Sequence, residues 1–245
     1  METDRYIRQI KSHPEFHQGK LSQAVVLIVG LGGLGSAAAM YLSAAGVGNM
    51  ILCDYDTISI SNLNRQILYS ETEVGQKKVK IAVAKLSRIN PDNLYIQLDE
   101  KFSRKTSMPS LAATLILDCL DNFQGRVDLA EFAFQNNIPL VHGAIHGFQG
   151  QMTFYMPGLS ACPVCIAPDE MIEDNTVSPA VGPCAGFIGS MQALETIKYF
   201  TGIGDLFINR FMLFNGLTGC FQELKVKADP HCPACSNETV QKQDN

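Results

Sequence analysis

From residue 24 to residue 36 the chain reads Ala24-Val25-Val26-Leu27-Ile28-Val29-Gly30-Leu31-Gly32-Gly33-Leu34-Gly35-Ser36. The run 24–29 is apolar and rich in β-branched residues, as in a strand buried on both faces of a parallel sheet. Gly30, Gly32 and Gly35 form the pattern G-x-G-x-x-G, which permits a tight turn and a close approach of the backbone to a phosphate. Residues 34–45 are rich in alanine and predict a helix whose first N–H groups would face a bound anion. The segment predicts a nucleotide site and leaves NAD, FAD and ATP open.

The composition is that of a globular protein, with 46% hydrophobic and 18% charged residues among 245. This length is ordinary for one α/β domain. The net charge of −5 and a pI near 5.5 argue against nucleic acid or an anionic membrane as the main partner. No unbroken apolar run reaches membrane length, and the first residues lack a signal pattern, so we expect a cytoplasmic protein.

Four of the eight cysteines form two C-x-x-C pairs, Cys162-Pro163-Val164-Cys165 and Cys232-Pro233-Ala234-Cys235. Two such pairs in a chain of cytosolic character are typical of a zinc site with four thiolate ligands. Four sulfurs leave no coordination position for water, so this zinc would stabilise the fold rather than take part in catalysis. The alternative is a redox pair.

Alternating strands and helices predict an α/β fold with a Rossmann-like, doubly wound sheet that is parallel in its N-terminal half. The expected strands are 24–29, 49–53, 94–98, 113–119 and 138–142, and helices are expected at 78–89 and 125–135. In the C-terminal half we expect antiparallel strands, and the first is the strand at 150–156, where apolar and polar residues alternate. We expect a mobile loop at 167–182 and then an amphipathic helix at 187–200, with Ile188, Met191, Leu194 and Ile197 on one face. Two further strands are expected near 210–214 and 220–226.

The charged residues that follow the strands help to decide which nucleotide the site binds. Asp54 lies about 20 residues after Gly35, where a Rossmann-type site places the carboxylate that binds ribose hydroxyls. Lys78 opens a helix, where a cation opposes the helix dipole, so we expect an anionic neighbour; the alternative is a solvated lysine. Asp121 and Asn122 follow a buried strand, at the edge where open α/β sheets bind ligands.

An ATP-dependent adenylyltransferase needs cations and a metal ligand here, whereas a dehydrogenase has no particular need for Arg65 and Lys78. Adenylation depends on neutralising phosphate charge in the transition state. Arginine offers paired N–H donors, lysine a point charge, and an aspartate such as Asp121 an oxygen ligand for Mg²⁺. The attacking carboxylate is already ionised at neutral pH and needs no general base.

With these residues, the chain over residues 4–236 resembles the MoeB/ThiF/HesA branch of the ubiquitin-activating-enzyme-like superfamily. The segments that carry the resemblance are Arg5-Tyr6-Ile7-Arg8-Gln9, Gly30-Leu31-Gly32-Gly33-Leu34-Gly35, Asp54-Tyr55-Asp56, Ser61-Asn62-Leu63-Asn64-Arg65-Gln66, Gly75-Gln76-Lys77-Lys78, Asp118-Cys119-Leu120-Asp121-Asn122 and the two C-x-x-C pairs.

The resemblance implies a homodimer that binds Mg-ATP and adenylates a carboxylate. Asp54 would bind the ribose, Asn62, Arg65 and Lys78 the phosphates, and Asp121 the magnesium, while Arg8 would reach into the partner's site. The implied catalytic residues are Arg8, Arg65, Lys78 and Asp121. The implied cofactor-binding residues are Gly30, Gly32, Gly33, Gly35, Asp54, Asp56, Asn62, Arg65, Gln66, Lys78, Asp121 and Asn122. Arg126 would orient the loop that carries Asp121.

The family substrate is the C-terminal glycine carboxylate of a ubiquitin-like sulfur carrier protein of thiamin or molybdopterin biosynthesis. We expect one ThiF-type adenylation domain over 1–236, with an N-terminal arm (1–20), a nucleotide-binding half (24–145) and a substrate-binding and zinc half (146–236). A disordered tail over 237–245 would follow.

The chain departs from the family at one position. Members that form a thioester or persulfide conjugate carry a cysteine in the loop before the last long helix, and 167–182 has none. Cys184, which follows Pro183, is as compatible with burial in the helix as with reactivity. Adenylation without covalent transfer is therefore favoured. A small-molecule or peptide carboxylate, a non-catalytic nucleotide-dependent scaffold and an NAD-dependent oxidoreductase remain as alternatives.

Overall fold

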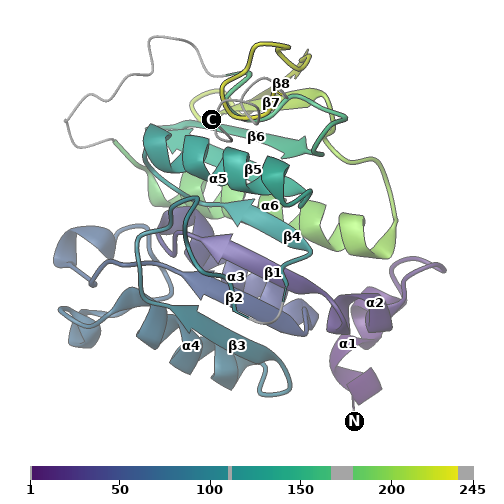
Figure 1. Ribbon diagram of the computed structural model, residues 1–245. Coiled ribbons are helices and arrows are strands. Elements are labelled where there is room, and N and C mark those ends of the chain that lie inside the picture. Colours follow the sequence, from purple (N-terminus) through teal and green to yellow (C-terminus); the bar gives the residue numbers. More distant parts are fainter. Residues whose placement is uncertain (1, 110–111, 167–178, 237–245) are drawn as a thin grey trace.

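A computed structural model describes residues 2–109, 112–166 and 179–236 of the protein (Figure 1). Its centre is one eight-stranded sheet in the order β3-β2-β1-β4-β5-β6-β7-β8. The strands are β1 (Val25–Val29), β2 (Asn49–Cys53), β3 (Leu94–Leu98), β4 (Leu115–Asp118), β5 (Leu140–His146), β6 (Gln149–Tyr155), β7 (Arg210–Asn215) and β8 (Cys220–Lys225). The α-helices are α1 (Glu2–Ile10), α2 (Gln18–Ser22), α3 (Gly33–Ala45), α4 (Lys78–Ile89), α5 (Phe123–Gln135) and α6 (Gly182–Thr201).

The predicted fold class is confirmed. Strands β1 to β5 pair in parallel, so their carboxyl ends share one edge of the sheet. Strands β6, β7 and β8 then pair antiparallel. All residues of β1 are buried, as its apolar run predicts for a strand in the middle of a covered sheet.

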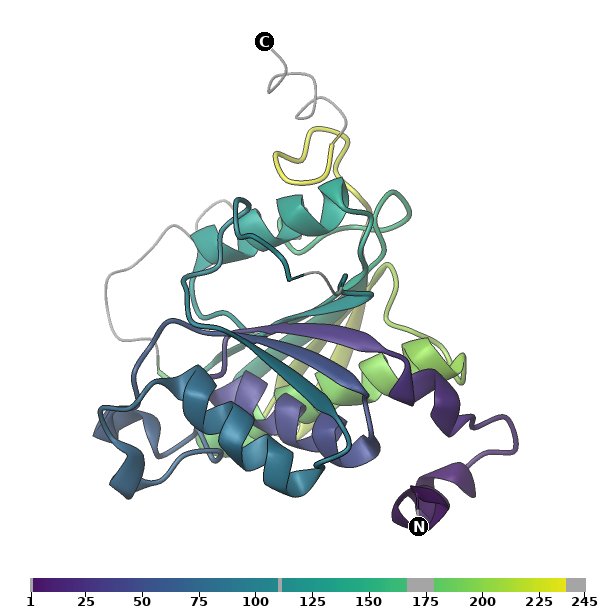
Figure 2. The same ribbon diagram turned by 60° about the horizontal axis from the view of Figure 1, so that its bottom comes forward.

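Helices cover the two faces of the sheet unequally (Figure 2). Helices α3, α4 and α6 lie on one face and α5 lies on the other. The contact between α3 and α6 is close, because a Cβ on Gly189 would lie only 2.3 Å from the carbonyl oxygen of Leu34. This packing holds the start of α6 beside the glycine-rich loop.

Helix α6 differs from the prediction in both its start and its buried face. It begins at Gly182, with Pro183 in its first turn, and Leu194 is 47% exposed. Gln192 and Glu195 are buried instead. The Gln192 amide donates to the carbonyl oxygens of Asp118 (2.8 Å) and Val141 (3.0 Å), and such bonds make a buried polar side chain favourable.

The other helices and strands differ less from their predicted boundaries. Strand β5 continues to His146 and turns into β6 through Gly147, whose φ is +58°. The motif 5–9, in the expected N-terminal arm, lies inside α1. Residues 167–178, most of the expected mobile loop, and the expected tail 237–245 lie outside the described residues, and the division into domain parts stays a prediction. Within the described ranges, no helix has the length and apolar character needed to cross a bilayer.

Candidate active site

Most of the predicted site residues lie at the carboxyl edge of the parallel strands. The glycine-rich loop follows β1, Asp54 follows β2, and Asp121 lies just beyond β4. The pKa of Tyr55 shows that charges from the ends of both strands affect the same side chain. The negative charge of Asp56 is the largest cause that raises the pKa of Tyr55, followed by burial and by the charges of Asp121 and Asp54. The ends of β2 and β4 therefore form one acidic rim.

Packing within the chain requires several glycines of the loop. Gly30 has a φ of +91°, and a Cβ there would lie 2.6 Å from the carbonyl oxygen of Cys119. A Cβ on Gly35 would lie 1.9 Å from the carbonyl oxygen of Gly30, and one on Gly33 would lie 2.8 Å from the Ala185 Cβ in α6. Without side chains at these positions the turn closes and both helices pack on it.

Gly32 differs, because packing does not require a glycine there. Its Cβ would have one described atom within 4 Å, the Nε2 of Gln66 at 3.6 Å, which is an ordinary contact. Gly32 is the N-cap of α3, with a φ of −75° and no side-chain cap. The N–H groups that begin α3 are thus open to an anion, whose close approach would explain the glycine.

Gly32→Ala is expected to leave the melting temperature within a few degrees of wild type and to weaken ATP binding at least about tenfold, about 1.4 kcal/mol. The added methyl group occupies the space beside the backbone where phosphate would lie. Gly35→Ala is the matched control and is expected to destabilise the fold because of its overlap with Gly30. Calorimetric ATP titration and thermal unfolding measure both effects; unchanged ATP affinity in Gly32→Ala would contradict the placement of phosphate.

Asp54 fixes the glycine-rich loop to the end of β2. Its Oδ2 accepts a hydrogen bond from Leu31 N at 2.7 Å, and its Oδ1 accepts one from Asp56 N at 2.8 Å. Burial raises the pKa of the Asp54 carboxyl, and the charge of Lys78 opposes this shift. Because each carboxylate oxygen has a second lone pair, Asp54 can accept bonds from ribose hydroxyls while it holds the loop.

Lys78 has the anionic neighbour that its position predicts. It begins α4, its side chain is buried, and its Nζ lies 2.8 Å from Asp56 Oδ2. The Asp56 side chain is half-exposed. A buried ammonium group with one solvent-accessible carboxylate partner can bind a phosphate from the same side.

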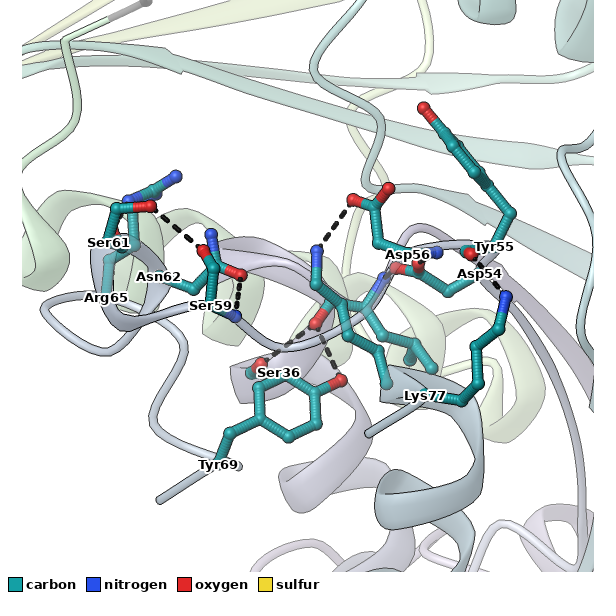
Figure 3. Close-up of polar contacts among 12 residues, drawn as sticks. Ser36, Asp54, Tyr55, Asp56, Ser59, Ser61, Asn62, Arg65, Tyr69 and Lys77 are labelled. Carbon is teal, nitrogen blue, oxygen red and sulfur yellow. Dashed lines mark hydrogen bonds and ion pairs between the residues drawn. The ribbon is translucent and has the colours of Figure 1, made fainter. Parts of the chain in front are cut away.

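The turn that carries Asn62 and Arg65 lies beside the loop (Figure 3). Arg65 Nη1 donates to the Ser61 carbonyl oxygen and to Asn64 Oδ1, each at 2.9 Å. Among the residues that the structure describes, no carboxylate pairs with Arg65. Asn62 Oδ1 accepts from Ser59 N at 3.1 Å, so this side chain also shapes the turn.

Gln66 is buried next to Gly32, and within the described ranges its Oε1 has no hydrogen-bond partner. A buried carbonyl oxygen without a partner is costly, so this atom fits a site completed by a ligand. Arg65, which has no carboxylate partner among the described residues, also fits a site completed by a ligand, since a phosphate would supply the missing anion.

Asp121 is exposed, whereas Asn122 caps α5 by accepting a bond from Gly125 N at 2.7 Å. The predicted nucleotide contact of Asn122 is therefore left to its Nδ2 group. Arg126 Nη2 donates to the Leu120 carbonyl oxygen at 2.8 Å, and this bond orients the loop as predicted. An exposed carboxylate at this rim is the kind of ligand that Mg²⁺ takes, so Asp121 fits the implied ion.

Arg8 does not join this cluster within one chain. Tyr6 and Gln9 anchor α1 to the C-terminal ends of α4 and α3, where Tyr6 Oη accepts from Asn90 Nδ2 (2.7 Å) and Gln9 Nε2 donates to the Ala45 carbonyl oxygen (2.8 Å). These helix ends lie at the amino edge of the sheet (Figure 1). Arg8 is exposed there, on the edge opposite the glycine-rich loop.

The four cysteines of the C-x-x-C pairs come together, as predicted. Their sulfur atoms all lie within 4.8 Å of one another, with Cys162 Sγ 3.7 Å from Cys165 Sγ and 3.6 Å from Cys232 Sγ, and Cys165 Sγ 3.4 Å from Cys235 Sγ. Tetrahedral zinc with bonds of about 2.3 Å would separate its sulfur ligands by about 3.8 Å. The donor set and its spacing therefore fit zinc.

Tyr155 packs in the same buried cluster as Cys162 and Cys232. Its side chain is fully buried, and its hydroxyl has no hydrogen-bond partner among the described residues. Burial raises the pKa of this phenol, and the charges of all four cysteines add to the shift.

Cys184 is buried in the first turn of α6, at 5% exposure. A Cβ on Gly216 in the β7–β8 turn would lie 3.1 Å from its sulfur. This position agrees with the expectation that the chain adenylates without a covalent transfer step through Cys184.

Sequence reasoning missed one buried polar pair at the edge of the site, Asp118 at the end of β4 and His142 in β5. The only signal in the sequence is that two apolar strands each change to a polar residue near their ends. The two positions become a pair only through the parallel register that places them side by side.

A sequence model of the ThiF family matches residues 5–234, and the chain belongs to this family. It is an adenylyltransferase of the MoeB/ThiF type. It is 39% identical to molybdopterin-synthase adenylyltransferase of Escherichia coli over 94% of this chain and 95% of the relative. It is 35% identical to the sulfur carrier protein ThiS adenylyltransferase of the same species, over 96% of each protein.

The chain is also 37% identical to adenylyltransferase and sulfurtransferase MOCS3 of Drosophila yakuba, and it spans about half, 54%, of that relative. A solved structure of E. coli MccB with MccA-N7isoASN superposes with a TM-score of 0.85 at 21% identity, covering 97% of this chain and 75% of MccB. This last likeness shows a shared fold.

Proposed function

We propose that the protein binds Mg-ATP at the carboxyl edge and adenylates the C-terminal glycine carboxylate of a ubiquitin-like sulfur carrier. The observation that carries this proposal is the set of charged groups at the edge of the sheet where the glycine-rich loop lies. Arg65 has no carboxylate partner among the described residues, Lys78 is buried with the half-exposed Asp56 beside it, and Asp121 is an exposed carboxylate at the same edge as the open N–H groups of α3. The adenylyltransferase names of the relatives that match over nearly their full length support the same activity.

In this reaction the carrier's carboxylate attacks the α-phosphorus of ATP. The bond between that phosphorus and the bridging oxygen breaks, which gives an acyl-adenylate and pyrophosphate. Arg65 and Lys78 neutralise the charge that moves onto the leaving oxygens, and Asp54 holds the ribose. Magnesium bound by Asp121 would shield the phosphates when present. Zinc bound by Cys162, Cys165, Cys232 and Cys235 would join two distant segments of the chain and stabilise the fold, and reduced thiolates of this kind suit the cytoplasm.

Pyrophosphate exchange into ATP tests the activity directly. Labelled pyrophosphate should enter ATP when Mg²⁺ and a thiamin-type or molybdopterin-type carrier are present. The same carrier without its terminal glycine is the matched control and should not support exchange. If neither full-length carrier supports exchange above this control, the proposed substrate is wrong.

Arg8 completes the active site of a second copy of the chain, because in its own chain it lies at the opposite edge. Arg8→Ala and Lys78→Met homodimers should each lose exchange. Mixed dimers formed from equal amounts of the two variants contain one intact site, and about a quarter of the wild-type rate should return. Arg5→Ala is the control, since Arg5 bonds to the Ile89 carbonyl oxygen of its own chain. Failure of the mixture to recover any exchange would contradict action in the partner.

A further inference from the structure

Strands β4 and β5 place a buried polar pair beside the candidate site. Asp118 and His142 face each other in register, on the same side of the sheet as α5. Asp118 is 1% and His142 2% exposed. The neighbouring position on β1 in the same register is Val29, so an apolar residue can occupy this layer of the sheet.

The hydrogen bonds of His142 are specific. Its Nδ1 lies 2.7 Å from Asp118 Oδ2, and its Nε2 lies 3.3 Å from the Nε2 of Gln151 on β6. Because the aspartate only accepts, Nδ1 carries the proton and donates to it. Nε2 faces the Gln151 amide, so both ring nitrogens of His142 have a defined partner.

Asp118 is also hydrogen-bonded to the loop that carries Asp121. Its Oδ1 accepts a bond from Leu120 N at 3.1 Å, and Arg126 Nη2 holds the Leu120 carbonyl oxygen at 2.8 Å. Both backbone polar groups of the residue before Asp121 are therefore fixed. Arg126 Nε lies 3.9 Å from Asp118 Oδ2 and has no hydrogen-bond partner in the described part of the chain, so His142 provides the shortest bond to that oxygen.

We propose that His142 is a positioning residue for the metal ligand Asp121, acting through Asp118 and Leu120; this rests on the proposed role of Asp121. The bond to His142 fixes the Asp118 carboxylate, and that carboxylate fixes the backbone from which Asp121 projects. A buried polar pair adds little stability compared with apolar residues of similar size. Its place next to Asp121 is explained by the geometry it imposes there.

The test compares His142→Ala, His142→Asn and Leu140→Ala as complexes with ATP and Mn²⁺, with no carrier present. Asparagine carries an N–H donor near the place of Nδ1 and should restore the bond to Asp118. Leu140 is buried on the same strand and the same face but pairs with Ile116 instead of Asp118, so its variant serves as a control for the loss of stability alone. Paramagnetic resonance of Mn²⁺ measures metal affinity, and thermal unfolding measures stability.

We expect His142→Ala to weaken Mn²⁺ binding in the ATP complex at least about tenfold, and His142→Asn to stay within about threefold of wild type. Leu140→Ala should lower the melting temperature without changing Mn²⁺ affinity. Wild-type affinity in His142→Ala, or a loss that follows melting temperature across all variants, would overturn the proposal. Because no carrier is needed, the inference can hold even if exchange with every carrier fails.

Discussion

Lys78→Met is expected to reduce pyrophosphate exchange about a thousandfold, about 4 kcal/mol of transition-state stabilisation, while the protein stays folded. Methionine fills the space of the lysine stem and removes only the charge. The ammonium group is buried beside Asp56, so no solvent ion replaces it efficiently. The loss should fall mainly on kcat if Lys78 binds the charge that develops on the leaving oxygens.

Lys77→Met is the matched control. Lys77 precedes Lys78 in the chain, but its Nζ bonds to the Tyr55 carbonyl oxygen at 2.8 Å (Figure 3). The same Nζ pairs with Asp99 at 2.9 Å at the surface. Its variant should keep nearly all exchange activity, since an exposed ion pair contributes little. Equal losses in the two variants would show that a general loss of positive charge, and not the position of Lys78, is responsible.

Cys162→Ser is expected to remove zinc and lower the free energy of unfolding by at least about 3 kcal/mol. The four sulfurs join segments that are far apart in the sequence, and a site with three thiolates holds zinc much less tightly. Cys220→Ser is the control, because Cys220 is exposed and lies outside the cluster. Elemental analysis of the purified protein and thermal unfolding measure both effects.

A chelator should destabilise the wild-type protein in the same way and leave Cys162→Ser unchanged. If wild-type protein carries no zinc, and chelator does not shift its melting temperature, the cluster is not a structural metal site. The alternative of a redox pair would then be tested by the response of melting temperature to a reductant.

Local sequence patterns predicted the elements whose environment is uniform. The apolar run of β1 and the periodic residues of α4 reproduce their observed bounds to within one residue, since each pattern already describes a fully buried strand or a one-sided helix. The anionic partner of Lys78 also followed from a local argument, because a cation at a helix N-terminus is unfavourable alone.

The features that the sequence did not predict depend on contacts between segments that are far apart in the chain. Gln192 rather than Leu194 is buried because carbonyl oxygens of two distant strands accept its amide bonds. The partnership of Asp118 and His142 depends on strand register, which is fixed only when the sheet forms. Arg8 was assigned to the partner's site by resemblance alone, and only the folded chain shows that it lies on the far edge of its own sheet.

The order of strands also affects how such a fold can diversify. Strand β1, which leads into the nucleotide loop, is wholly buried, whereas β8 lies at the end of the sheet with every residue exposed. Apart from Phe221, whose ring packs against Phe187 and Phe214, substitutions on β8 therefore change the folding free energy little, typically by less than about 0.5 kcal/mol each. A lineage with this fold can vary the outer strand and acquire new specificity, while selection keeps the chemistry beside the central strands unchanged.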